Sequence, residues 1–72
     1  PAPDAVLETA QRFQGLEKAL ARLPPEHREI LLLREIEEMS YEDIAAVLNL
    51  NTGTVKSRIA RARAGLLEKM PR

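Results

Sequence analysis

Residues 40–63 constrain the fold of this 72-residue chain more than any other stretch. Ser40 and Asp43 have the spacing of a helix N-cap and the acidic residue that follows it in a capping box. The polar turn Asn49-Leu50-Asn51 separates this short helix from a longer basic one. Asn49 tolerates the left-handed conformation that ends helices, and either Asn51 or Thr52 can cap the next helix. The pattern predicts helices over residues 41–48 and 52–70, in the order of a helix-turn-helix.

The residues before this stretch predict two more helices. Asp4 can cap a first helix that runs to about Leu23, where Pro24 and Pro25 end it. Pro25 also suits the first turn of a second helix, which is expected to run to Glu37. No segment shows the alternation of a strand, and no cysteine is present to form a disulfide. The predicted fold is therefore all-α, a four-helix domain with a C-terminal helix-turn-helix, held together by helix packing alone.

Apolar residues at three- and four-residue steps predict the buried face of each helix. Gly15 weakens the first helix, so residues 1–15 are expected to be a linker or helix extension, residues 16–37 a helical hairpin and residues 40–70 the helix-turn-helix of a single domain. The predicted inner positions are Val6, Ala10, Phe13, Leu16, Leu20 and Leu23 in the first helix, Ile44, Ala45, Val47 and Leu48 in the third, and Val55, Ile59, Ala62 and Leu66 in the fourth.

The centre of the second helix is apolar on every face, over Ile30, Leu31, Leu32 and Leu33. A helix of this kind is normally buried all round, and a domain of this size has little material with which to cover it. Two interpretations stay open: part of this surface meets a partner protein, or the first helix wraps it. The expected partner-binding residues are Ile30, Leu31, Leu32, Leu33 and Ile36.

The formal net charge is zero, but the two parts of the chain differ strongly in charge. Residues 1–50 carry ten acidic and five basic side chains, a balance of −5, and residues 51–72 carry one acidic and six basic side chains, a balance of +5. The field that a partner meets is local, so this split is typical of a polyanion-binding element on an acidic scaffold.

The predicted fourth helix has an outward sector suited to the DNA major groove. At 100° per residue, small or hydrogen-bonding residues lie opposite its apolar face and cations flank them. Small residues let a helix enter a groove about 12 Å wide, while flanking cations reach phosphates. Arg61 can make a bidentate contact to guanine, and Asn51, Thr52 and the free N–H groups of the first turn suit a phosphate. The outward residues are Gly53, Thr54, Ser57, Ala60, Arg61 and Ala64, with Lys56 and Arg63 on one edge and Arg58 on the other.

Four motifs together resemble region 4 of bacterial extracytoplasmic-function sigma factors, over residues 16–67. They are Leu23-Pro24-Pro25-Glu26, Leu33-Arg34-Glu35, Ser40-Tyr41-Glu42-Asp43-Ile44-Ala45 and Gly53-Thr54-Val55-Lys56-Ser57-Arg58-Ile59-Ala60-Arg61-Ala62-Arg63. The resemblance implies recognition of minus-35 promoter DNA, docking on the beta flap of RNA polymerase and control by an anti-sigma factor. By position, the family's DNA contacts fall on Thr54, Lys56, Ser57, Arg58, Ala60 and Arg61.

Three positions depart from the family pattern. Relatives often have glycine near Glu38, so Glu38 is expected to be strained or its turn to be built differently. Lys56 replaces an arginine of many relatives and cannot form a bidentate fork to a base. Ala60 is smaller than its counterpart in some relatives, so the promoter sequence cannot be transferred from them.

Other functions are weighed on the same residues. The single histidine, His27, and the absence of cysteine leave no nucleophile–base pair, metal cage or cofactor site, so we expect neither an enzyme nor a small-molecule binder. The output domain of a response regulator and a helical protein-interaction module are the alternatives. No apolar run approaches the roughly 20 residues that cross a bilayer, so a cytoplasmic bacterial location is expected. No stretch of these residues is expected to be the promoter-melting domain of sigma factors, and the chain is expected to be a fragment.

Overall fold

The computed structural model describes the backbone of residues 3–70 and the side chains of residues 10–70. All regular elements in this part of the chain are helical. They are α1 (Pro3–Ala21), α2 (Pro25–Leu31), the π-helical turn η1 (Leu32–Ile36), α3 (Tyr41–Leu48) and α4 (Thr52–Lys69). The all-α prediction with a C-terminal helix-turn-helix is confirmed.

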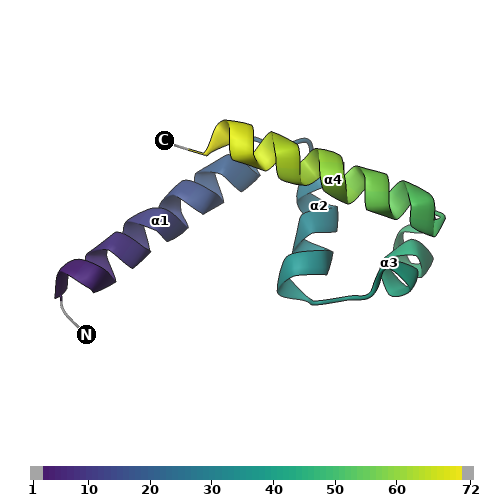
Figure 1. The fold of residues 1–72 in the computed structure, drawn as a ribbon, viewed down its shortest axis with the longest axis horizontal. Coiled ribbons are helices and arrows are strands. Elements are labelled where there is room, and N and C mark those ends of the chain that lie inside the picture. Colours follow the sequence, from purple (N-terminus) through teal and green to yellow (C-terminus); the bar gives the residue numbers. More distant parts are fainter. Residues whose placement is uncertain (1–2, 71–72) are drawn as a thin grey trace.

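Helix α4 is the element on which the others assemble (Figure 1). Helix α2 runs away from the middle of α4, and α3 lies beside the N-terminal end of α4. The C-terminal end of α1 meets α4, whereas the rest of α1 extends away from the body of the molecule. In the described part of the chain, no helix is both long and apolar enough to span a membrane.

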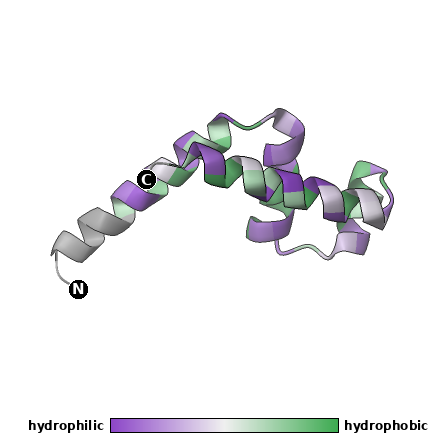
Figure 2. Ribbon diagram, turned by 45° about the horizontal axis from the view of Figure 1, so that its top comes forward, coloured by the Kyte–Doolittle hydropathy of each residue, from purple (hydrophilic) through white to green (hydrophobic). Residues whose placement is uncertain are grey.

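The core lies where α2, α3 and α4 meet, and its centre is formed by Ile30, Ile44, Val55 and Ile59, all fully buried. Leu23, between α1 and α2, and Leu31 complete it on the α1 side. Figure 2 shows green hydrophobic residues alternating with purple and pale ones along α4, as expected for a helix with one buried face. The predicted inner face of the fourth helix is confirmed: Val55, Ile59 and Ala62 are buried and Leu66 packs against the same cluster.

Three predicted inner positions were wrong, the first of them Ala10, which is exposed on α1. Phe13 is 60% exposed. Only the C-terminal end of α1 meets the body of the protein, so Phe13, near the middle of the helix, has nothing to pack against. Val47 is 62% exposed because α3 has only eight residues and buries one narrow stripe, Ile44 and Ala45. The predicted inner position of Val6 lies outside the described side chains.

The ends of the first two helices also differ from the sequence prediction. Helix α1 begins at Pro3, so Asp4 lies inside it and cannot be its N-cap, and it ends at Ala21 instead of Leu23. The second helix begins at Pro25 as predicted and ends at Ile36, but its last part widens into a π turn. There the Glu37 N–H donates to the Leu32 carbonyl at 3.0 Å, five residues back.

Glu38, two residues after the end of η1, has a left-handed φ of 56°. The next residue, Met39, donates its N–H to the Leu33 carbonyl at 3.1 Å, and Arg34 Nη1 donates to the Met39 carbonyl at 2.8 Å. These bonds hold the chain in the turn that leads to α3. The left-handed conformation is unfavourable for a residue with a Cβ, which confirms the expectation of strain at Glu38.

We predict that Glu38→Gly stabilises the domain. The left-handed conformation destabilises a residue other than glycine by about 1–2 kcal/mol, and this cost disappears in the glycine variant. Glycine has more freedom in the unfolded chain, which offsets about 0.5–1 kcal/mol of the gain. The expected net gain is roughly 0.5–1 kcal/mol, or several degrees in the midpoint of thermal unfolding followed by circular dichroism. Glu37→Gly, at a φ of −81°, is the matched control and should lower the midpoint. A fall in the midpoint for Glu38→Gly would show that the turn carries no strain.

Candidate nucleic-acid interface

The turn between α3 and α4 is built by caps on both sides. Ser40 Oγ accepts the Asp43 N–H at 3.0 Å and starts α3, and Asn49, at φ 57° and ψ 49°, ends it. The Leu50 N–H then reaches back to the Ala45 carbonyl at 2.9 Å. This bond closes the last turn in the way typical of a left-handed helix end. Leu50 packs on the core, so the turn is fixed to the body of the domain.

Asn51, and not Thr52, caps α4. Its Oδ1 accepts the Thr54 N–H at 2.7 Å. A Cβ on Gly53 would stand 3.3 Å from this oxygen, closer than most such contacts, so the small residue leaves the cap undisturbed. Because these groups are fixed before any ligand arrives, the N-terminal turn of α4 presents oriented N–H groups at the surface, the arrangement that binds anions.

The outward sector of α4 lies opposite the core, as predicted. The central residues Ser57 and Arg61 are exposed and Thr54 is half-buried beside the cap. Ser57 Oγ donates to the Thr54 carbonyl at 3.2 Å, which leaves the hydroxyl lone pairs free to accept from a base amino group. Gly53, Ala60 and Ala64 add no bulk between them. The sector therefore has the low profile that a helix needs in order to enter the major groove.

Tyr41 of α3 lies close to two cations, a contact that the sequence did not reveal. The Arg34 guanidinium lies 4.6 Å from the ring centroid and the Lys56 ammonium 5.9 Å from it. Both distances fall within the range of cation–π attraction. Lys56, a predicted DNA contact, is therefore drawn toward the α3 side of α4.

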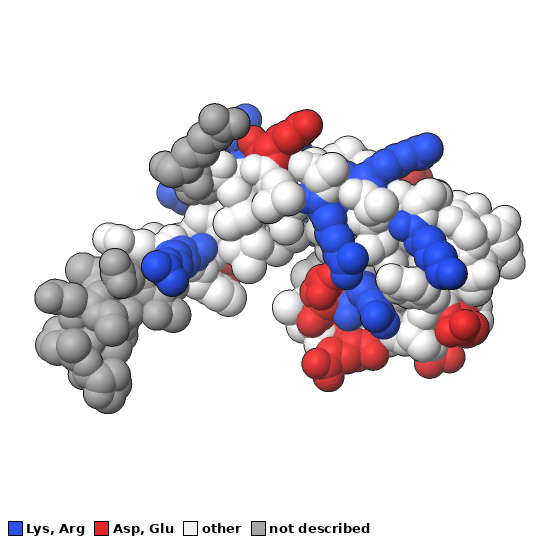
Figure 3. Space-filling view, in the orientation of Figure 1, with Lys and Arg blue, Asp and Glu red and all other residues white. Residues whose placement is uncertain are grey.

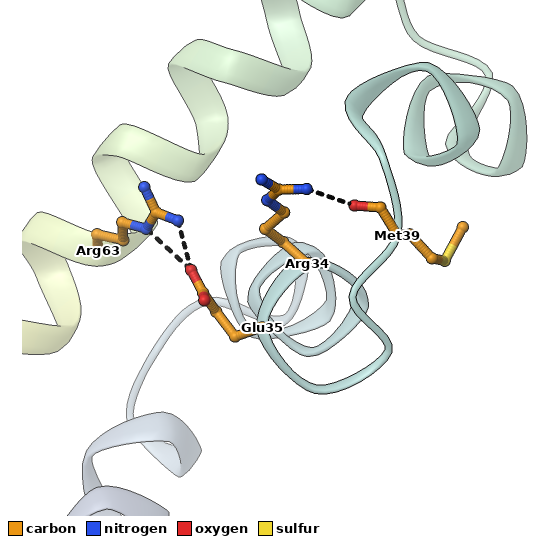
Figure 4. A network of polar contacts seen from close by, with 4 residues as sticks. All are labelled: Arg34, Glu35, Met39 and Arg63. Atoms are coloured by element: carbon orange, nitrogen blue, oxygen red, sulfur yellow. Dashed lines mark hydrogen bonds and ion pairs between the residues drawn. The ribbon is translucent and has the colours of Figure 1, made fainter.

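Arg63 is held by Glu35 of η1, 28 residues earlier in the chain (Figure 4). Arg63 Nε donates to Glu35 Oε1 at 3.0 Å, and its Nη2 donates to the same oxygen. This hydrogen bond and the charge of Glu35 raise the pKa of Arg63 above its ordinary value. Both side chains are half exposed, so the pair adds little stability, but it satisfies the cation within the protein. Arg63 was predicted as a DNA contact, and in this structure it is not free.

Charge is segregated on the surface. On the face drawn in Figure 3, most lysine and arginine side chains lie along α4, and most acidic side chains lie below it, over η1 and α3. The predicted separation of a basic element from an acidic scaffold is thus also a separation in space.

An apolar groove lies next to the Glu35–Arg63 pair, between α1, η1 and α4. It has a volume of 230 Å³, and Leu32 and Ile36, 41% and 69% exposed, form its outer wall. The predicted partner surface needs correction here, because Ile30 and Leu31 belong to the core and Leu33 is half-buried. The groove is lined by Leu16, Leu20, Leu31, Leu32, Glu35, Ile36, Arg63 and Leu66.

Comparison with known proteins decides between the families that use a helix-turn-helix. The family model described as Sigma-70, region 4 matches residues 13–66, well over half of the chain. The chain belongs to the sigma-70 region 4 family. Region 4 is therefore favoured over the output domain of a response regulator and over a helical protein-interaction module.

Curated relatives of this region 4 domain include three bacterial sigma factors. The ECF RNA polymerase sigma factor SigE of Mycolicibacterium smegmatis is 42% identical over 66 residues, 92% of this chain and 26% of the relative. RNA polymerase sigma factor YlaC of Bacillus subtilis is 34% identical over 94% of this chain and 39% of the relative. The ECF RNA polymerase sigma-E factor of Escherichia coli is 35% identical over 94% and 36%. The chain thus spans between a quarter and two fifths of the length of these relatives.

Proposed function

We propose that this chain is the promoter-recognition domain of an extracytoplasmic-function RNA polymerase sigma factor, in which α4 reads minus-35 DNA. The observation that carries the proposal is the outward sector of α4, with Ser57 and Arg61 exposed at its centre and a fixed anion-binding turn at its N-terminus. A major groove about 12 Å wide admits such a helix. The family membership and the names of the relatives point the same way.

The proposed roles divide by chemistry. Arg61 has the geometry for bidentate contact to guanine, and Ser57 and Thr54 are suited to base edges. Asn51, Thr52 and the N–H groups of the first turn are suited to one phosphate wall. Lys56 and Arg58 flank the sector as phosphate contacts, Ala60 leaves room between them, and Arg63 joins them only when its bond to Glu35 opens.

We further propose that the apolar groove holds core RNA polymerase through its beta flap, and that an anti-sigma factor competes for it. The groove combines exposed Leu32 and Ile36 with buried Leu31 and three half-buried leucines, Leu16, Leu20 and Leu66. An apolar helix from a partner is the natural occupant of such a groove, because its side chains lose contact with water there. Location in the bacterial cytoplasm follows from a role in transcription.

The salt dependence of DNA binding tests the DNA-reading proposal. A minus-35 duplex is first selected from a random pool, and its dissociation constant is then measured by fluorescence anisotropy at several salt concentrations. Each phosphate contact should contribute about −0.9 to the slope of log affinity against log salt. We expect a slope of several units and tighter binding to the selected duplex than to a scrambled one. Absence of DNA binding at low salt, by the free domain and by its complex with core polymerase, would refute the proposal.

A further inference from the structure

A second group of cations lies in a cleft between α1 and the C-terminal end of α4. The cleft has a volume of 420 Å³ and is lined by Lys18 and Arg22 of α1 and by Lys69 of α4, together with Gly15, Glu68 and Met70. Lys18 and Arg22 are exposed and Lys69 is half-buried. Three cations face a single acid, Glu68, so the cleft is positive although the chain as a whole is neutral.

The two long edges of α4 differ in how their cations are satisfied. At 100° per residue Lys69 lies on the same edge as Arg58, whereas Lys56 and Arg63 lie on the opposite edge. On that opposite edge Arg63 is bound to Glu35 and Lys56 lies over the ring of Tyr41. Within residues 10–70, no acidic side chain forms an ion pair with Arg58 or Lys69, or with the cations of α1. On the edge that carries Arg58 and Lys69, unlike at Arg63, no cation is therefore held by an acidic side chain of the described residues.

The length of α4 brings this edge out of the groove. A helix of 18 residues is about 27 Å long, more than twice the width of the major groove, which is about 12 Å. Reading helices contact bases with their N-terminal residues. The last turn of α4, which carries Lys69, must then pass beyond the groove, and α1 adds Lys18 and Arg22 at that end.

We propose that Lys18, Arg22 and Lys69 form a second phosphate-binding site, which holds the DNA backbone beside the groove read by α4. The inference rests on the proposed function of α4 as a DNA reader. Cations that reach only phosphates contribute affinity without sequence information. The site therefore strengthens binding to every sequence equally, and it makes α1 a part of the DNA interface.

The test compares the double variant Lys18→Gln/Arg22→Gln with the unaltered domain. Glutamine keeps the helix propensity of α1 and removes both charges. Anisotropy titrations use the selected duplex and a scrambled duplex over a range of salt. The slope of log affinity against log salt should become shallower by about 0.9 for each contact removed, close to 2 in total, and affinity for the two duplexes should fall by the same factor.

Arg12→Gln is the matched control. It removes one positive charge from α1 outside the cleft, half of what the double variant removes, and at physiological salt its effect should be small because charges more than about 8 Å away are screened. Thermal melts establish that each variant folds, and the single variant Lys69→Gln, with an expected change in slope of about 0.9, gives an independent reading from α4.

Three results would overturn the inference. The first is an unchanged slope for a folded double variant that still prefers the selected duplex. The second is a loss confined to the selected duplex, which would make the cations base readers. The third is unchanged DNA binding with weaker binding to core polymerase, which would assign the cleft to an acidic protein surface. Failure of the unaltered protein to bind either duplex would instead refute the proposed function of α4.

Discussion

Replacing Ile59 by alanine is expected to remove a large part of the domain's free energy of unfolding. Ile59 is fully buried at the centre of the contact between α4 and the rest of the core. Truncating a buried isoleucine to alanine costs about 2–5 kcal/mol, because apolar contact is lost and a cavity is left. A domain of this length has a free energy of unfolding of roughly 4–11 kcal/mol in total. Urea denaturation followed by circular dichroism measures the loss.

Ile36→Ala is the control for Ile59→Ala. The same side chain is truncated, but Ile36 is 69% exposed at the rim of the apolar groove, so unfolding should change by about 0.5 kcal/mol or less. The variant should at the same time weaken the binding of any partner that occupies the groove. Equal destabilisation by the two substitutions would mean that the core is not where α2, α3 and α4 meet.

Replacing Arg61 by alanine is expected to reduce sequence discrimination by roughly 1–3 kcal/mol at one base pair. Arg61 stands exposed at the centre of the outward sector, where its guanidinium has the geometry for the two acceptors of a guanine. The measurement is the affinity for a set of duplexes that differ from the selected sequence at single positions. One position should become indifferent to substitution while the others keep their effects.

Lys56→Ala is the comparison for Arg61→Ala. Lys56 lies at the edge of α4 near Tyr41, and an ammonium can bind a phosphate but cannot form a bidentate fork to a base. Its loss should weaken binding to all duplexes by a similar factor. Equal losses on selected and scrambled DNA for Arg61→Ala would refute the role of Arg61 as a base reader.

The parts of the fold that the sequence predicted are those determined locally. Ser40 lies three residues from the N–H that it caps, and Asn49 ends α3 by its own backbone preference, so short-range rules were enough. The inner face of α4 follows from periodicity, because this long helix is covered along most of that face. Strain at Glu38 was one of two expectations drawn from the missing glycine, and the left-handed φ of 56° agrees with it.

The parts that the sequence did not predict depend on tertiary packing. Periodicity predicted Phe13 as an inner residue but could not show that only the C-terminal end of α1 packs on the body of the protein. The π turn arises inside an apolar run that would suit an ordinary α-helix equally well. The bond between Glu35 and Arg63 joins residues 28 positions apart, and nothing local indicates which of many acids a given arginine meets. In the candidate site, α4 was therefore predictable from sequence, whereas the state of its edges was not.

The most direct test of the central claim, that α4 is the DNA-reading surface, is a map of backbone amide shifts in the nitrogen-15-labelled domain as the selected duplex is added. The largest changes should fall on the turn and outward sector of α4, between Asn51 and Ala64, with smaller ones at Lys18 and Arg22. The chemical shifts of the amides around Leu32 and Ile36 should stay unchanged, because the apolar groove is proposed to bind a protein partner and not DNA. Changes centred on that groove with α4 unaffected would contradict the claim.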